Sequence, residues 1–291
     1  MLFFTDSEIT MTDEEFPLLR DLIYNYSGLF FAEENRYLLE RRLSSRLAHH
    51  QLSTFQDYYY YLKYDAGREQ ELSDIMDLLT TNETYFFRES FQLKAFTDEI
   101  IPELTKRKAK NGDKTIRIWS AGCSTGEEPY TIAMLLVEKP ELAGWKIEIV
   151  GTDISQRVLH HARKGVYGNS SFRVAEPHYK NRYFQDLDGG YRVGDRIREF
   201  VTFSRLNLYD SSRFLFLGKM DIIFCRNVII YFDLPAKKRV IEHFYSTLNP
   251  GGFLLLGHSE SLMNITTAFK LRHFKNDMVY EKPLKLESGA N

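Results

Sequence analysis

The sequence predicts an α/β protein in which an N-terminal all-helical domain precedes an α/β domain with a small inserted antiparallel β-subdomain. Two patterns in the 291 residues carry this prediction. From residue 12 to 79 apolar side chains recur only at helical spacing, whereas from residue 116 onward strand-like apolar segments alternate with helical ones. We therefore expect a helical domain at 1–79 and the α/β domain at 80–291, with the β-subdomain at about 170–200.

The first domain is expected to consist of helices that pack through apolar stripes. Thr12–Glu15 has the spacing of a capping box, and Gly28 ends the helix that follows it. A second capping box is expected at Ser53–Gln56, opening another helix. Two further helices are predicted over Glu33–His49 and Glu69–Thr80.

The α/β domain opens with Ile116–Thr131, whose pattern is that of a strand, a turn of small residues and a helix. Gly122 and Gly126 would let the backbone of this turn approach a ligand closely. Asp153 follows the next strand, at the position that binds ribose hydroxyl groups in such folds. Short glycine motifs have many false matches, so an ordinary βαβ unit with a tight turn stays the alternative.

After this second strand the regular alternation is interrupted. Short antiparallel strands are predicted over 179–184, 191–193 and 197–203, with a turn at 188–190. The α/β pattern resumes with the apolar strand Met220–Cys225, which ends at Arg226. A helix, a strand and a final hairpin are predicted after it, over 235–248, 253–257 and 269–281.

Charge and cysteine content exclude several classes of protein. The chain has 38 basic and 40 acidic residues, which argues against a general nucleic-acid-binding protein. Cys123 and Cys225 form no Cys-x-x-Cys pair, so we expect neither a disulfide framework nor a zinc site. The N-terminus lacks signal-peptide features and no apolar run could span a bilayer, so we expect a cytoplasmic protein without direct membrane insertion.

Common catalytic motifs are also missing. The sequence contains no GxxxxGK[ST], which argues against P-loop chemistry, and no GxSxG or HExxH. The turn at 122–126 lacks the third glycine of a dinucleotide fingerprint. What remains is a nucleoside-binding α/β domain with few candidate general bases.

Five ordered motifs, and nearly the whole chain with them, resemble the CheR-type chemotaxis protein methyltransferases. The motifs are Thr80–Arg88, Ser120–Tyr130, Gly151–Ile154, Phe224–Phe232 and Gly257–Glu260. The resemblance implies a Rossmann-like methyltransferase domain that takes S-adenosylmethionine as methyl donor and releases S-adenosylhomocysteine, with no metal. It also implies that the acceptors are glutamate side chains on the cytoplasmic helices of chemoreceptors, which become methyl esters.

The resemblance assigns roles to individual residues. It implies cofactor contacts for Asn82, Thr84, Arg88, Glu127, Asp153, Asn207, Leu208, Arg226 and Asn227. Glu128 is the alternative to its neighbour Glu127. Arg88 and Tyr231 are the expected catalytic residues, the first orienting the acceptor carboxylate and the second donating a hydrogen bond to it. His258 and Glu260 are expected to shape the cleft rather than to react.

The expected chemistry needs little from acid–base groups. A glutamate carboxylate, with an ordinary pKa of about 4.3, is already ionised at neutral pH. The enzyme must chiefly align nucleophile, methyl group and sulfur and exclude water. Taken alone, Tyr231 would be one more aromatic residue in an apolar segment, and Thr80–Arg88 would be a packed domain junction.

A surface for the receptor is expected on the second helix. Arg41, Arg42 and Arg46 crowd there with Arg36, and arginine favours bidentate contacts with carboxylates. We expect the first three to bind acidic receptor helices near the methylation sites, although a solvated helix face is the alternative. The loop at 183–191 is tighter than the one with which some family members hold a receptor tether peptide, so no dependence on such a peptide is expected.

Two other functional classes remain open on the sequence. One is a CheR-like regulatory module that binds the cofactor without transferring its methyl group, which the presence of Arg88, Glu127, Asp153 and Tyr231 argues against. The other is a methyltransferase for small molecules or RNA, and the balanced charge counts against RNA. We expect the protein to be a monomer.

Overall fold

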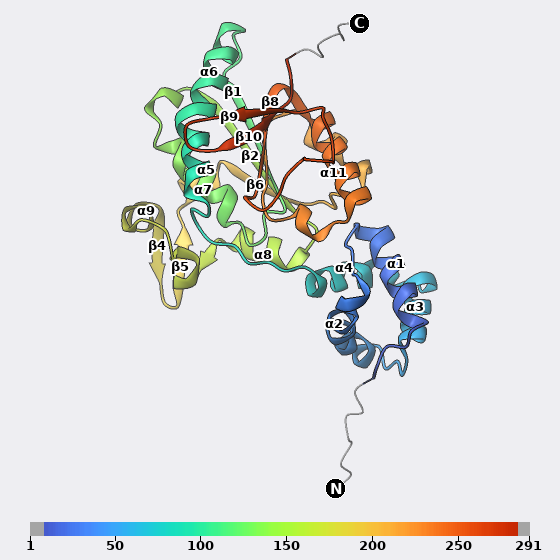
Figure 1. The fold of residues 1–291 in the computed structure, drawn as a ribbon. Helices are drawn as coiled ribbons and strands as arrows, with labels where there is room; N and C mark the ends of the chain where they lie inside the picture. Colours follow the sequence, from blue (N-terminus) through green and yellow to red (C-terminus); the bar gives the residue numbers. More distant parts are fainter. Residues whose placement is uncertain (1–8, 285–291) are drawn as a thin grey trace, which may run out of the picture. The chain divides into compact units, whose positions relative to one another are not determined.

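The computed structural model describes residues 9–284. The chain forms two compact units, whose boundary falls between Thr81 and Asn82 (Figure 1). In its described part the first unit is helical, and the second contains a 7-stranded sheet and a separate 3-stranded sheet. The predicted fold class is confirmed: an all-helical part precedes an α/β part that carries a small β-subdomain.

The helices of the first unit begin close to their predicted starts. They are α1 (Glu15–Ser27), α2 (Arg36–His49), α3 (Phe55–Tyr64) and α4 (Arg68–Leu79), with a 3-10 turn, η1 (Glu33–Asn35), before α2. The first capping box is confirmed, since the N–H groups of Thr12 and Glu15 each donate to the other's side chain, at 2.8 and 3.2 Å. The second was placed wrongly by one residue, because the side chain that accepts the Asp57 N–H, at 3.0 Å, is that of Thr54.

The mainly apolar core of the first unit contains a deeply buried carboxylate. Glu71 of α4 is only 3% exposed and accepts hydrogen bonds from Arg46, His50 and Tyr58. Burial alone would raise the pKa of Glu71, but these donors outweigh it and hold that pKa at about 2. The carboxylate is therefore an ionised link between α2, α3 and α4.

The larger sheet of the second unit has the strand order β6-β2-β1-β7-β8-β10-β9. The first five strands in this order run parallel, and β10 is antiparallel to both of its neighbours. The strands are β1 (Thr115–Ala121), β2 (Lys146–Asp153), β6 (Val201–Arg205), β7 (Met220–Cys225), β8 (Leu248–Leu256), β9 (Lys270–His273) and β10 (Met278–Glu281). The predicted final hairpin is confirmed as β9 and β10.

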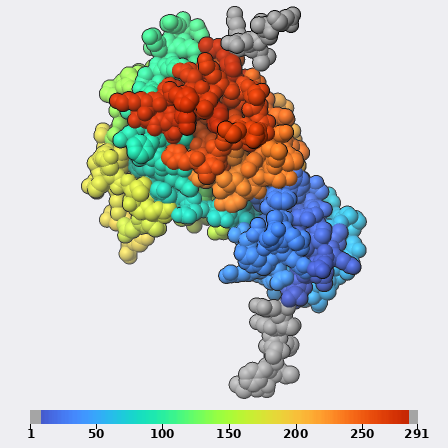
Figure 2. Space-filling model, viewed as in Figure 1, coloured from blue at the N-terminus to red at the C-terminus, as the bar shows by residue number. Residues whose placement is uncertain are grey.

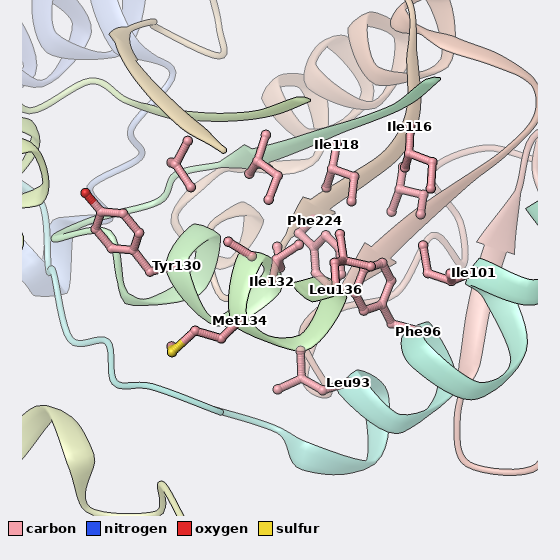
Figure 3. Close-up of a cluster of buried hydrophobic side chains, with 14 of the residues drawn as sticks. Leu93, Phe96, Ile101, Ile116, Ile118, Tyr130, Ile132, Met134, Leu136 and Phe224 are labelled. Carbon is pink, nitrogen blue, oxygen red and sulfur yellow. The ribbon is translucent and has the colours of Figure 1, made fainter. Parts of the chain in front are cut away.

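Helices cover both faces of the parallel strands. On one face lie α5 (Ser90–Ala95), the π-helical turn η2 (Phe96–Ile100), α6 (Ile101–Lys110) and α7 (Glu127–Val137). Figure 3 shows Phe96 of η2 and Ile132 of α7 in this core with Ile118 of β1. Burial of such side chains is the main favourable term in folding.

Two further helices complete the layers. α8 (Gln156–Lys164) adjoins α7, because the Tyr130 hydroxyl donates to the Ala162 carbonyl at 3.0 Å. On the opposite face, α11 (Leu234–Thr247) places Phe244 against Trp119 of β1, with ring centroids 5.2 Å apart. Since Trp119 alternates with Ile118, β1 is buried on both faces, as expected for a central parallel strand.

The smaller sheet has the order β3-β5-β4 and is antiparallel throughout. Its strands are β3 (Val166–Tyr167), β4 (Phe184–Leu187) and β5 (Gly190–Val193), and the helical pieces around it are η4 (Asn169–Phe172), α9 (Pro177–Tyr183) and α10 (Asp195–Arg198). In the space-filling view this part, in yellow, forms a lobe on the surface of the second unit (Figure 2).

Two of the predicted short strands were wrong. Most of 179–184 belongs to α9, because Pro177 occupies its first turn, where a proline favours a helix. The segment predicted as a strand over 197–203 divides between α10 and β6, and β6 pairs in parallel with β2 in the larger sheet. Of the three predicted strands, 191–193 alone falls wholly in the small sheet.

Candidate functional site

The carboxyl ends of the parallel strands meet at one edge of the larger sheet. β1 has β2 on one side and β7 on the other, so the chain order reverses at β1. In open α/β sheets such a reversal forms a crevice in which ligands bind. Four of the five sequence motifs follow the strands β1, β2, β7 and β8 at this edge.

The turn after β1 approaches its surroundings very closely. Gly122 and Gly126 have φ of 76° and 95°, a region that disfavours residues with a Cβ. A Cβ on Gly122 would lie 2.5 Å from Val228 Cγ2, and one on Gly126 would lie 2.8 Å from Ala162 Cβ. Both glycines are therefore required by geometry, and the turn lies directly against the segment that follows β7.

Asp153 fixes this turn from the end of β2. Its Oδ2 accepts the Ser124 N–H at 2.9 Å, and its Oδ1 accepts the Ser155 N–H at 3.0 Å. The side chain is 8% exposed. A carboxylate offers about four acceptor positions, so a residue in this place can hold the turn and accept ligand hydroxyl groups as well.

The two adjacent glutamates at the start of α7 have different partners. Glu127 is buried and accepts hydrogen bonds from the hydroxyls of Thr125 at 2.6 Å and Ser171 at 3.0 Å. Burial raises the pKa of Glu127, and these two donors oppose the rise. Glu128 instead accepts the Ser120 hydroxyl at 2.7 Å and pairs with Arg226.

Arg226, the first residue after β7, is a buried cation. Its Nε lies 2.8 Å from Glu128 Oε2, and its Nη2 donates to the Arg88 carbonyl at 2.9 Å. Among residues 9–284, Arg226 Nη1 and Asn227 Oδ1 are buried with no hydrogen-bond partner. Unpaired buried polar atoms are costly, so these two atoms make this edge a candidate site for a polar ligand.

The segment Asn82–Glu89 crosses the start of α7. The Ser124 hydroxyl donates to the Asn82 carbonyl at 3.0 Å, and the Phe87 N–H donates to Thr131 Oγ1 at 3.2 Å. Thr84 lies half-buried between these two anchors. The segment is thereby fastened to the same turn that Asp153 holds.

Arg88 is held in a strained part of this segment. Its neighbours Phe87 and Glu89 have φ of 60° and 56°, in the left-handed region. Such backbone costs about 1–3 kcal/mol per residue and persists where the surroundings enforce it, often at functional sites. The Arg88 guanidinium donates to the Glu83 carbonyl at 3.1 Å and is half-exposed.

Asn207 and Leu208 lie beside Asp153. The Leu206 N–H donates to the Asp153 carbonyl at 3.0 Å, which brings the end of β6 against the end of β2. Asn207 Oδ1 accepts the Tyr209 N–H at 3.0 Å and shapes the turn. Leu208 is 7% exposed and supplies an apolar side chain at this corner.

Tyr231 ends a 3-10 turn, η6 (Ile229–Tyr231), and its side chain is 37% exposed. The turn is bound to Glu260, which accepts the N–H groups of Asn227 at 2.8 Å and Val228 at 2.9 Å. Burial raises the pKa of Glu260, although its backbone donors favour the ionised form. The expected cofactor and catalytic residues thus gather at one edge, joined by hydrogen bonds.

Several groups at this edge were not foreseen from the sequence. Ser171 and Thr125 bond Glu127, and Glu128 pairs with Arg226 across a long stretch of chain. No local pattern marks a serine in η4 as a partner of a glutamate in α7. Glu260 was expected only to shape the cleft, and its bonds to the N–H groups of Asn227 and Val228 were not foreseen.

The three arginines expected to bind the receptor all lie in the first unit, but they differ in exposure and in the partners they already have. Arg41 is exposed. Arg42 donates to the Leu79 carbonyl at 2.7 Å. Arg46 forms ion pairs with Glu71 and Asp74, and its side chain is 17% exposed. Arg46 therefore has a structural partner within its own unit.

The fold and the carboxyl-end edge of its larger sheet together define a class of protein domain. A parallel sheet with a glycine turn at its reversal point and an acid at the end of the next strand is characteristic of α/β domains that bind nucleoside ligands. The chain belongs to the CheR methyltransferase family. The model described as "CheR methyltransferase, SAM binding domain" matches residues 82–278, and "CheR methyltransferase, all-alpha domain" matches residues 14–80.

Relatives named as chemotaxis methyltransferases match almost end to end. Chemotaxis protein methyltransferase 2 of Vibrio cholerae is 39% identical over 284 residues, covering 97% of this chain and 97% of the relative. Chemotaxis protein methyltransferase of Borreliella burgdorferi is 40% identical over 257 residues, covering 87% and 90%. In the described part of this chain, no helix is long and apolar enough to cross a membrane.

Proposed function

We propose that this protein transfers a methyl group from S-adenosylmethionine to glutamate side chains of chemoreceptors, giving methyl esters and S-adenosylhomocysteine. The observation that carries the proposal is the gathering of Asp153, Arg226 and the strained Arg88 segment around one sheet edge. The names of the relatives support a chemotaxis substrate. The chemoreceptor glutamates and the cytoplasm as the site of action follow from this proposal.

The donor set at the edge fits the proposed cofactor. In this proposal Asp153 accepts the ribose hydroxyl groups, and Asn207 and Leu208, which lie beside it, contact the adenine base. Arg226 Nη1 and Asn227 Oδ1, both without a hydrogen-bond partner in the described chain, suit the polar amino-acid end. Asn82, Thr84 and Glu127 complete the proposed contacts. We prefer Glu127 over Glu128, because Arg226 already pairs with Glu128.

When bound, S-adenosylmethionine supplies an electrophilic methyl group on a sulfonium sulfur. A carboxylate oxygen of the acceptor forms the new bond to that carbon, the carbon–sulfur bond breaks, and its electron pair stays on sulfur. No proton is transferred, so the site needs no general base. This agrees with a site in which the carboxylates of Asp153, Glu128 and Glu260 each already accept hydrogen bonds from the protein.

The side chains that act on the acceptor are Arg88 and Tyr231. Arg88 is half-exposed and can orient the incoming carboxylate, which lowers the entropic cost of aligning it. Tyr231, 37% exposed, can donate a hydrogen bond to the oxygen that does not react. Both are partly exposed, as contact with a large protein substrate requires. The proposal includes no metal.

The first unit is proposed to bind the receptor. Arg41 and Arg42 on α2 would meet acidic residues of a receptor helix, with Arg46 contributing less because it is paired with Glu71. A tether peptide is not required in this proposal. The Asp188–Gly189 turn joins β4 and β5 in a two-residue hairpin, since Leu187 pairs with Gly190.

The test is transfer of a labelled methyl group by the full chain to cytoplasmic receptor fragments. We expect label on the fragment that alkali releases as methanol, the behaviour of an ester. A matched fragment with its exposed glutamates replaced by glutamine should stay unlabelled. RNA and small carboxylic acids serve as competing acceptors. Cofactor binding without any transfer would indicate a regulatory module instead and would overturn the proposal.

A further inference from the structure

Glu260 organises the segment that carries three residues of the proposed site. Its two carboxylate oxygens accept four backbone N–H groups: Oε2 those of Asn227 and Gly257, both at 2.8 Å, and Oε1 those of Val228 at 2.9 Å and Ile230 at 3.3 Å. Three of these donors belong to the turn between Arg226 and Tyr231. A single side chain thus satisfies the amino end of the whole turn.

The backbone of the turn is shaped to bind an anion. Asn227 has φ of 60°, in the left-handed region, which turns successive N–H groups toward one point. Such a concave group of N–H donors needs an anion, and the Glu260 carboxylate supplies it from the loop after β8. The Tyr231 N–H in turn donates to the Val228 carbonyl at 3.2 Å, so the hydrogen bonds that start at Glu260 extend to Tyr231.

Close packing leaves no room for a looser arrangement. A Cβ on Gly257 would lie 2.9 Å from the Asn227 nitrogen and 3.0 Å from Glu260 Oε2. The side chain of Glu260 is 9% exposed, so water cannot easily replace it as acceptor. The ends of β7 and β8 are therefore locked together at the edge where the cofactor is proposed to bind.

We propose that Glu260 is a positioning residue, whose ionised carboxylate holds the Asn227–Tyr231 turn so that Arg226 and Asn227 face the cofactor and Tyr231 faces the acceptor. The inference rests on the proposed function for its catalytic part. Its cofactor part rests only on the geometry of the edge. In this role Glu260 acts through the backbone of the turn and not by contact with the cofactor or the acceptor.

The principal variant is Glu260→Gln, made in the full chain. Glutamine keeps the volume but offers one acceptor oxygen, and its NH2 group would point at backbone N–H donors. We expect the dissociation constant for S-adenosylmethionine to rise about tenfold or more, the effect of unpairing two backbone donors. The kcat for methyl transfer should fall as well, while the KM for the receptor changes little, because the arginines proposed to bind the receptor, Arg41 and Arg42, lie in the first unit.

Glu15→Gln is the matched control. Glu15 is also 9% exposed and also accepts two backbone N–H groups, of Thr12 and Gln56, but it lies in the first unit. If Glu260 only contributes stability, both variants should lower the melting temperature and leave cofactor affinity per folded molecule unchanged. If Glu260 positions the turn, only its own variant should lose affinity.

Gly257→Ala tests the same contact while keeping the carboxylate, and it replaces Glu260→Gln if that variant does not fold. The added methyl group should displace Glu260 from Asn227 and weaken cofactor binding in the same direction. Normal affinity and kcat in a folded Glu260→Gln variant, or in Gly257→Ala if the first is unfolded, would overturn the inference. Lack of ester formation by the unmodified protein would instead refute the proposed function, and cofactor affinity would still decide the role of Glu260.

Discussion

Glu128, in the first turn of α7, pairs with Arg226 at the end of β7, with 2.8 Å between Oε2 and Nε and side chains that are 13% and 3% exposed. This pair joins the start of α7, the helix that follows β1, to the end of the neighbouring strand β7. The Ser120 hydroxyl donates to the other oxygen of Glu128 at 2.7 Å. The pair is thus fixed on both sides and sets the position of the guanidinium.

Glu128→Gln should strongly destabilise the second unit. The amide keeps the size of the side chain but leaves Arg226 as a buried charge without its counterion, a change that costs about 3–5 kcal/mol. Urea unfolding measures it. The control is Glu148→Gln, which removes a partner of Arg117 in an ion pair whose side chains are 33% and 34% exposed, and should cost under about 1 kcal/mol. Equal losses in the two variants would contradict the prediction.

Asp153→Ala should weaken binding of S-adenosylmethionine by roughly 1–3 kcal/mol, the cost of leaving polar groups unpaired. Calorimetry gives the affinity directly. Because Asp153 also accepts N–H groups of Ser124 and Ser155, Asp153→Asn is the companion variant, which keeps one acceptor oxygen. Unchanged affinity in a folded Asp153→Ala protein would remove this residue from the site.

Arg88→Ala and Tyr231→Phe should lower turnover more than they disturb folding. Both side chains are partly exposed, so their loss creates no cavity in the core. We expect kcat for receptor methylation to fall at least tenfold, about 1.4 kcal/mol in the barrier, with a nearly unchanged thermal melt. Normal turnover in both variants would mean that their roles are structural.

The stability of the first unit should depend on acid through Glu71. Its folded pKa, about 2, lies below its ordinary value of 4.5, so the stabilisation is complete above pH 4.5 and is lost as the pH falls toward 2. A shift of this size corresponds to a contribution on the order of 3 kcal/mol. Urea titrations of the full chain between pH 7 and pH 2 test this. In the Glu71→Gln variant the free energy of unfolding should depend less on pH below 4.5. If the free energy of unfolding falls equally with acid in that variant, other carboxylates cause the effect.

Arg41, Arg42 and Arg46 replaced together by alanine should abolish receptor methylation and spare cofactor binding. The contact is largely electrostatic, so it should also weaken as salt screens charges over about 10 Å or less. Arg46→Ala alone should act through stability, because it breaks the pair with Glu71, whereas Arg41→Ala should act only on the receptor. Tight binding of a tether peptide to the protein, with methylation dependent on it, would contradict this account of recognition.

The sequence alone determined the fold class, the helical stripes of the first unit, the strand–turn–helix at 116–131 and the final hairpin. These features follow from local rules, because side-chain periodicity, capping and glycine turns are written in neighbouring residues. The site residues from Asn82 to Asn227 were named through the resemblance to a known family, and Asp153 was placed also by its position after a strand.

Only the tertiary structure decided which of these groups belong to one another. Glu128 rather than Glu127 pairs with Arg226, Glu260 bonds the turn after β7, and Arg46 is bound to Glu71, and each contact joins distant parts of the chain. Likewise β6 looked like part of the inserted sheet until its parallel pairing with β2 placed it in the larger one. A strand's pattern records which faces are buried, whereas its partner is set by the packing of the whole unit.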